Sequence, residues 1–151
     1  MTGPDAPLIR DVGLCAKLVT FAKALSDEAN RAALAFRAAV DAEAWPGVEE
    51  TAISLASTFV RYDPLVLAPE ALQARLAALI QTQDWGAAAL PKGRRLWTVP
   101  VAIGPEEGPQ FEEAAALVGR SAQEAKAEIL ASRTRVLTLG FAPGQPYMGE
   151  L

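Results

Sequence analysis

The chain has 151 residues and a formal net charge of −4, with 51% hydrophobic and 21% charged residues, proportions typical of a globular protein that can bury a core. It contains no histidine and one cysteine, Cys15, which excludes Ser-His pairs, Cys-His pairs, imidazole zinc sites and internal disulfides within this chain. The acidic balance argues against a nucleic-acid partner, and no apolar run approaches the roughly 18 residues that indicate a membrane span. The lone cysteine indicates a reducing cytoplasm, and we expect Cys15 to be a buried core thiol.

The first half of the chain predicts two pairs of β-strands. Short runs rich in apolar and β-branched residues, separated by turn signals, are typical of strands. These runs cover residues 8–12, 14–21, 51–55 and 58–62. A tight connection is expected at Ala56-Ser57.

One amphipathic helix is predicted after each pair of strands. Ser26 offers an N-cap oxygen at the start of the first helix, which ends at Trp45-Pro46-Gly47. The second helix opens at Pro69 and ends near Trp85. The apolar stripes of the two helices are Ala29, Ala33, Phe36 and Val40, and Leu72, Leu76, Leu79 and Ile80. An antiparallel sheet with both helices on one face would bury both stripes, so we predict an α+β, two-layer domain over residues 1–88.

The second half, residues 89–151, is predicted to be a separate domain that follows a small-residue connector. A strand is expected over residues 96–103, at a sheet edge or with a bulge because it contains a proline. A helix is expected over residues 110–118, and Ser121 begins a capping box for another. Glu112 and Glu113 are interpreted as favourable charges in a first helical turn, with acid–base work as the alternative. A last strand is expected over residues 135–141.

The stretch that follows this strand is the candidate binding segment. Glycines allow close approach of backbone to a ligand or another chain, and prolines lower the cost of ordering a loop. The alternative is a structural turn into another strand, the commoner role of such loops. Catalytic residues stay unassigned, and no metal ligands are predicted. The candidate substrate- or partner-binding residues are Gly140, Phe141, Pro143, Gly144, Gln145, Pro146, Tyr147 and Gly149.

This segment resembles the Gly-Phe-x-Pro-Gly-Phe-Pro-Tyr-Leu-Gly run of the family that includes KipI, the 5-oxoprolinase subunit PxpB and allophanate hydrolase subunit 1. Gln145 and Met148 stand where the family usually has Phe and Leu. The likeness covers nearly the whole chain. Further matching segments are residues 21–30, 47–50, 60–64, 99–101 and 108–114.

The resemblance implies a small N-terminal α+β domain followed by the first part of a cyclophilin-like β-barrel. It implies a subunit of an ATP-dependent 5-oxoprolinase, which converts 5-oxoproline to glutamate, or of an allophanate- or urea-degrading complex. In either case the chain acts in an oligomer with a homologous second subunit, binds no cofactor alone, and belongs to a complex that uses ATP. An alternative is a KipI-like regulator that binds and inhibits a histidine kinase.

Three positions depart from the family pattern. The family usually has a His-Thr pair where Ile129-Leu130 stands, often Tyr at Thr134, and Gly-Asp where Asp11-Val12-Gly13 stands. Any role of that histidine is absent here or is supplied by another polypeptide. On the family pattern, the strand over residues 135–141 would also have an unpaired edge, which recruits other strands.

Overall fold

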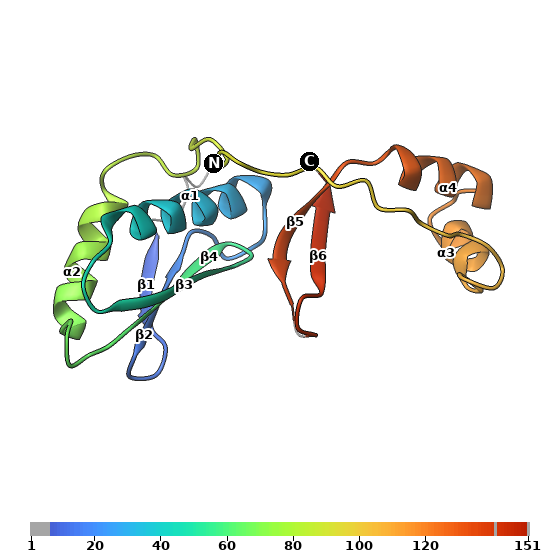
Figure 1. Cartoon of the computed structure of the whole chain (residues 1–151). Helices are drawn as coiled ribbons and strands as arrows, with labels where there is room; N and C mark the ends of the chain where they lie inside the picture. The colour runs from blue at the N-terminus through green and yellow to red at the C-terminus, as the bar shows by residue number, and fades with distance from the viewer. Residues whose placement is uncertain (1–6, 141, 151) are drawn as a thin grey trace. The chain divides into compact units, whose positions relative to one another are not determined.

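The structure is a computed structural model that describes residues 7–140 and 142–150 (Figure 1). The described residues divide into two compact units. Unit 1 contains residues 7–93 with most of 136–148, and unit 2 contains residues 94–135 with 149–150. The predicted domains, 1–88 and 89–151, remain a prediction. In the described part of the chain, none of the helices combines the length and apolar character that a membrane crossing requires.

In the first half of the chain, two strands followed by one helix occur twice, as predicted. In the second half, two helices precede two strands. The elements are β1 (Leu8–Asp11), β2 (Ala16–Thr20), α1 (Asp27–Glu43), β3 (Val48–Ser54), β4 (Ser57–Tyr62), α2 (Pro69–Ile80), α3 (Phe111–Leu117), α4 (Ala122–Ala131), β5 (Thr134–Leu139) and β6 (Pro146–Glu150).

Unit 1 contains a four-stranded sheet with the order β1-β2-β4-β3 and antiparallel pairing throughout. Because successive side chains of a strand point to opposite faces, β4 buries every second residue. Thr58, Val60 and Tyr62 are buried on the core face, whereas Phe59 and Arg61 point to the other face. The predicted antiparallel sheet is therefore confirmed.

Helix α1 begins where its sequence predicts, because Ser26 Oγ accepts a hydrogen bond from the backbone N–H of Ala29 at 3.1 Å. Helix α2 begins at Pro69, whose missing N–H costs nothing in the first turn. Helix α1 packs against β3 and β4, and α2 against β1. Both helices contribute to one apolar core with the sheet, so the two-layer arrangement is also confirmed. The core residues are Val19, Ala32, Phe36, Val40, Val60, Tyr62, Leu67, Leu72, Leu76, Ile80 and Trp85.

Unit 2 contains two short helices, α3 and α4, that pack against each other. The predicted capping box is present: Ser121 Oγ accepts from the backbone N–H of Glu124, and the Glu124 carboxylate accepts from the backbone N–H of Ser121 at 2.8 Å. Glu112 and Glu113 lie in the first turn of α3, as the charge interpretation predicts.

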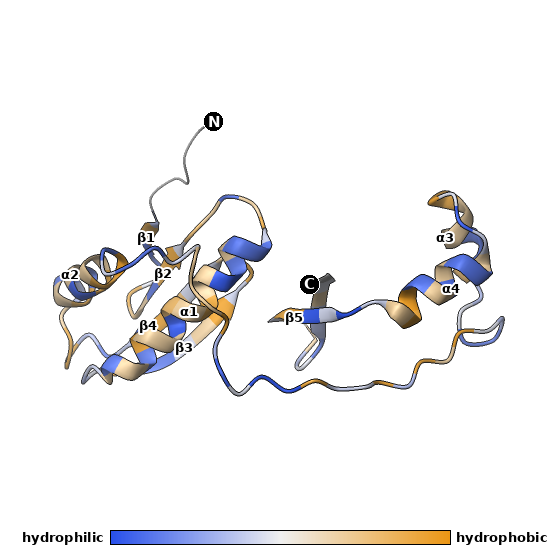
Figure 2. Ribbon diagram, turned by 90° about the horizontal axis from the view of Figure 1, so that it is seen from above, coloured by the Kyte–Doolittle hydropathy of each residue, from blue (hydrophilic) through white to orange (hydrophobic). Residues whose placement is uncertain are grey.

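The predicted strand over residues 96–103 is wrong, since this segment forms no strand (Figure 2). Its apolar side chains are largely exposed, with Trp97 at 71% and Val99 at 70%. A strand requires a hydrogen-bonded neighbour, and no strand among residues 7–140 and 142–150 pairs with this segment.

Two further details differ from the prediction. Cys15 is exposed, because it lies in the connection between β1 and β2, one residue before the buried part of β2 begins. The turn between β3 and β4 contains Leu55 and Ala56 in place of Ala56-Ser57. Leu55 has a φ of 54°, a left-handed conformation that a leucine rarely adopts.

Candidate functional site

The candidate segment forms the end of a β-hairpin. Strand β5 pairs with β6 in a separate two-stranded sheet, so the loop is also the turn into another strand. Strand β6 occupies one edge of β5, so the unpaired edge that the family pattern predicts can only be the opposite one. In the part of the chain that the structure describes, no third strand joins this sheet.

Two backbone hydrogen bonds close the hairpin loop. The N–H of Gln145 donates to the carbonyl of Ala142 at 2.8 Å, and the N–H of Gly140 donates to the carbonyl of Gln145 at 2.9 Å. The first bond encloses Pro143 and Gly144, and Gly144 has a φ of 82°. Proline followed by a glycine with positive φ is the pattern of a type II turn, so the loop has a shape that its sequence specifies.

The ring of Tyr147 lies against the backbone of Gly140 across the hairpin. A Cβ atom at Gly140 would overlap the Tyr147 ring, so only glycine leaves room for this aromatic contact. Tyr147 remains 50% exposed, and Met148 beside it is 59% exposed. The hairpin thus presents an aromatic ring with one edge fixed by the chain and the rest open to another molecule.

The structure brings the described candidate residues together at this hairpin. Phe141 lies outside the described residues. The turn residues are exposed, and Pro146 is the first residue of β6, a position that proline tolerates because a strand needs no donor there. The residues gathered at the hairpin are Gly140, Pro143, Gly144, Gln145, Pro146, Tyr147 and Gly149.

A buried amide ties the hairpin to the sheet of unit 1. Asn30 lies in α1 and has 0% exposure. Its Nδ2 donates to the carbonyl of Leu55 at 2.6 Å and to the carbonyl of Leu137 at 3.1 Å. Since Leu137 belongs to β5, one side chain joins α1, the β3–β4 turn and the hairpin strand that leads to the candidate loop.

Asn30 is the residue that the sequence interpretation missed as part of the site. Asn30 belongs to residues 21–30, one of the segments that resemble the family, and it lies on the buried face of α1. A polar residue within a helical apolar stripe indicates a specific hydrogen bond, because an amide is costly to bury without partners. That signal points to Asn30 without identifying its partners.

The charged groups with shifted pKa values belong to elements other than the hairpin. Hydrogen bonding to Glu50, together with the charge of Glu49, raises the pKa of Arg61 on the β3–β4 ladder. Hydrogen bonds from Ser121 lower the pKa of Glu124 at the start of α4. Residues 7–140 and 142–150 contain no group of three or more His, Cys, Asp or Glu side chains arranged to hold a metal ion. The hairpin therefore offers backbone groups, a phenol and apolar surface, which are suited to binding.

The profile of the family described as carboxyltransferase domain, subdomain C and D, matches residues 7–151. The chain belongs to this family. The match confirms the resemblance to KipI and the 5-oxoprolinase subunit PxpB.

A curated relative and a solved structure agree with the assignment. A 5-oxoprolinase subunit of Bacillus subtilis (strain 168) is 26% identical over 157 residues, covering 95% of this chain. The match covers 62% of that relative, so this chain spans less than two thirds of its length. The crystal structure of TTHA0988 is 26% identical, with a TM-score of 0.68, and the match covers 93% of this chain and 26% of that one.

The urea carboxylase of Kluyveromyces lactis has the same fold over this region. Its TM-score is 0.60 at 16% identity, and the match covers 92% of this chain and 14% of that one. The neighbours confirm a mixed α/β fold of the carboxyltransferase type.

This member of the carboxyltransferase family differs from the expected pattern at an exposed place. Ile129 and Leu130, where a His-Thr pair is usual, lie near the end of α4 and are 46% and 61% exposed. Because neither side chain has an ionisable group, this pair cannot transfer a proton as a histidine does. It adds instead to the uncovered apolar surface of unit 2.

Proposed function

We propose that this chain is a subunit of an ATP-dependent 5-oxoprolinase-type complex that converts 5-oxoproline to glutamate with a homologous second subunit. The observation that carries the proposal is the match to the Bacillus subtilis 5-oxoprolinase subunit over 95% of the chain. The named relative is itself a subunit, which supports a requirement for a partner. The ATP used by the complex is bound outside this chain, and the complex acts in the cytoplasm.

The hairpin supplies the binding side of the reaction in this proposal. Its loop is closed by its own backbone hydrogen bonds, so binding costs little further ordering. Tyr147 and the backbone at Gly144 contact the substrate or the partner subunit. Since this chain contains no histidine, any imidazole that takes part in the acid–base chemistry comes from the partner.

Additional strands complete the second half of the fold in this proposal. The uncovered apolar side chains of residues 96–103 and of β5 are the surface that such strands would bury. With these strands in place, the second half of the chain forms the first part of a cyclophilin-like barrel in this proposal.

The test is co-expression of the chain with its homologous second subunit, followed by measurement of ATP-dependent glutamate release from 5-oxoproline. We expect release with both subunits and none with either alone. Tyr147→Ala is expected to lower kcat/KM at least about tenfold, the effect of losing a well-packed aromatic contact. Leu65→Ala, at a 95% exposed position of unit 1, is the matched control and is expected to retain activity.

Parallel reactions with urea or allophanate in place of 5-oxoproline distinguish the related activities. Turnover of either one, without glutamate release, would assign the allophanate- or urea-degrading reaction and refute the 5-oxoprolinase proposal. Inhibition of histidine-kinase autophosphorylation, with no turnover of any of the three compounds, would favour the regulatory alternative.

A further inference from the structure

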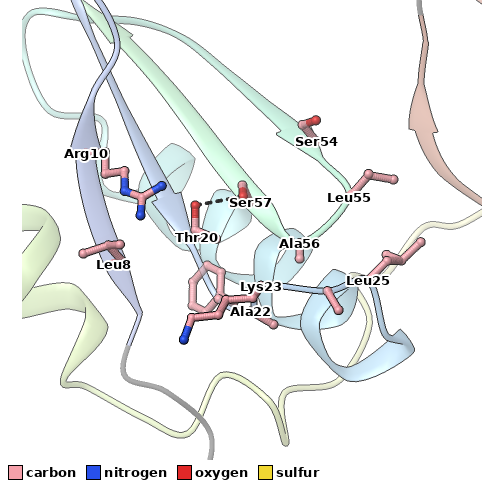
Figure 3. A pocket seen from close by; sticks show the side chains of 12 residues that line it. Leu8, Arg10, Thr20, Ala22, Lys23, Leu25, Ser54, Leu55, Ala56 and Ser57 are labelled. Atoms are coloured by element: carbon pink, nitrogen blue, oxygen red, sulfur yellow. Dashed lines mark hydrogen bonds between the residues drawn. The ribbon is translucent and has the colours of Figure 1, made fainter.

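Unit 1 has an open pocket that is separate from the hairpin loop. It has a volume of about 710 Å³, within the range of small-molecule sites. It lies where the ends of β1, β2 and β4 meet the residues that lead into α1 (Figure 3). Its walls come from three places: β1, residues 20–25, and the β3–β4 turn with the residues on either side of it.

A row of directly opposed residues forms the floor of the pocket. Leu8 pairs with Thr20, Thr20 with Ser57, and Ser57 with Ser54, so the row crosses all four strands. The neighbouring residue Thr58 is buried on the helix-covered face. Because alternate residues point to opposite faces, the row lies on the face that the helices leave uncovered. Ser57 Oγ donates to Thr20 Oγ1 at 3.0 Å, which fixes two of these hydroxyls (Figure 3).

The pocket has basic side chains in its lining although the chain is acidic. Arg10 and Lys23 line it, and none of its described lining residues is Asp or Glu, although the whole chain has a net charge of −4. Arg10 is two residues from Leu8 on β1 and therefore shares its face. Within residues 7–140 and 142–150 the Arg10 guanidinium forms no hydrogen bond or ion pair. The Arg10 guanidinium, with no Asp or Glu among the described lining residues, creates a local potential that favours an anion.

Exposed leucines line both sides of the pocket. Leu8 is 46% exposed, Leu25 47% and Leu55 40%. Figure 3 shows Leu8 beside Arg10 on β1, with Leu25 and Leu55 across the hollow. An apolar chain placed between these residues would remove their surfaces from water, which is favourable.

Together, the charge and the apolar walls define the ligand. We propose that this pocket binds an organic carboxylate, with the carboxylate held by Arg10 and the apolar chain against Leu25 and Leu55. A guanidinium presents a planar fork of donors that matches a carboxylate. This site does not depend on the 5-oxoprolinase proposal, because it involves neither the hairpin nor the partner subunit.

The test is an amide NMR titration of the full chain with hexanoate at low ionic strength. We expect saturable shifts at Thr20, Leu55 and Ser57, with a Kd of about 1–10 mM for so small a ligand. Acetate lacks the apolar chain and hexanol lacks the charge, so each is expected to bind at least about tenfold more weakly.

Variants separate a specific site from general charge attraction. Arg10→Gln is expected to weaken hexanoate binding about tenfold, whereas Lys92→Gln makes the same charge change outside the pocket lining and is expected to leave binding unchanged. Leu25→Ser is expected to weaken binding, with Leu65→Ser as its exposed control. Circular dichroism checks that each variant is folded.

Several results would overturn the assignment. Equal effects of Arg10→Gln and Lys92→Gln, shifts confined to other parts of the chain, or hexanol binding as tightly as hexanoate would each exclude the proposed site. Hexyl phosphate distinguishes the two common anionic head groups, and binding of this compound about tenfold tighter than hexanoate would refute a carboxylate site.

Discussion

Replacing Asn30 is expected to loosen the β5–β6 hairpin specifically. The Asn30 amide donates to the carbonyls of Leu55 and Leu137, which belong to the β3–β4 turn and to β5. Asn30→Leu keeps a side chain of similar length but removes both hydrogen bonds. The hairpin then loses its polar attachment to α1, while its own backbone hydrogen bonds remain.

The expected cost follows from the two carbonyl groups. A net loss of about 1 kcal/mol for each hydrogen bond, with added desolvation where water does not replace the amide, gives about 2–3 kcal/mol in the free energy of unfolding. Thr58→Val is the matched control, because Thr58 is also fully buried and donates to a carbonyl of α1, that of Ala33, at 2.8 Å. It removes one such bond and is expected to cost about 1 kcal/mol.

Urea unfolding followed by circular dichroism measures the loss in the free energy of unfolding. Amide hydrogen exchange shows which part of the chain is destabilised. The N–H of Gly140 is a suitable reporter because it is hydrogen-bonded within the hairpin. We expect exchange at Gly140 to be at least about fivefold faster in Asn30→Leu, the factor that corresponds to 1 kcal/mol. If Asn30→Leu proves too unstable, Asn30→Ala leaves space for water and provides the same comparison.

A hairpin that responds alike to both substitutions would contradict a specific role of Asn30. The two variants are compared at urea concentrations that give them the same global stability. Equal acceleration of amide exchange at Gly140 in Asn30→Leu and Thr58→Val would mean that Asn30 does not stabilise β5 specifically.

Three further predictions concern local geometry and charge. Gly140→Ala places a Cβ against the Tyr147 ring and is expected to accelerate hairpin amide exchange, with Tyr147→Ala restoring slow exchange in the double variant; no rescue would exclude the steric cause. Leu55→Gly relieves the left-handed φ of 54° and is expected to raise the free energy of unfolding by about 1 kcal/mol in urea titrations, whereas Leu55→Ala, which keeps a Cβ, gives no gain. The pKa of Glu124 is lowered by hydrogen bonds from Ser121, so its contribution to α4 is present above the ordinary value of 4.5 and is lost as pH falls through the folded pKa. A circular-dichroism titration into acid is expected to show this loss of helix signal, and an unchanged titration in Ser121→Ala would contradict it.

Unit 1 is predictable from the sequence because its signals are local. The alternation of Thr58, Val60 and Tyr62 identifies the buried face of β4 without knowledge of any other strand. Ser26 identifies the start of α1 through the hydrogen bond that its side chain accepts, and Pro69 identifies the start of α2 because the first helical turn needs no N–H donor. Hydrophobic stripes then leave few ways to cover one face of the sheet.

The segment over residues 96–103 shows why the second half is harder to predict. Its apolar and β-branched residues satisfy the local pattern of a strand, but the ladder depends on a partner that the pattern does not specify. The same limit explains β6, where prolines and glycines indicated a loop and pairing with β5 produced a strand from Pro146 onward.

One part of the candidate site is likewise predictable from local sequence, and another part is not. Pro143 and Gly144 predict a tight turn because each residue restricts or permits particular φ values. The link from Asn30 to Leu137 joins residues 107 positions apart, and no local pattern identifies such a partner. The open pocket likewise depends on the register that aligns Leu8, Thr20 and Ser57.

The unpaired segment before α3 gives the chain an intrinsic optical reporter. Trp97 is 71% exposed in unit 2, whereas Trp85 is 6% exposed in the core of unit 1. Iodide in solution therefore quenches the emission of Trp97 in preference to that of Trp85. Any polypeptide that settles over residues 96–103 shields this indole, so assembly can be followed by fluorescence without an attached dye.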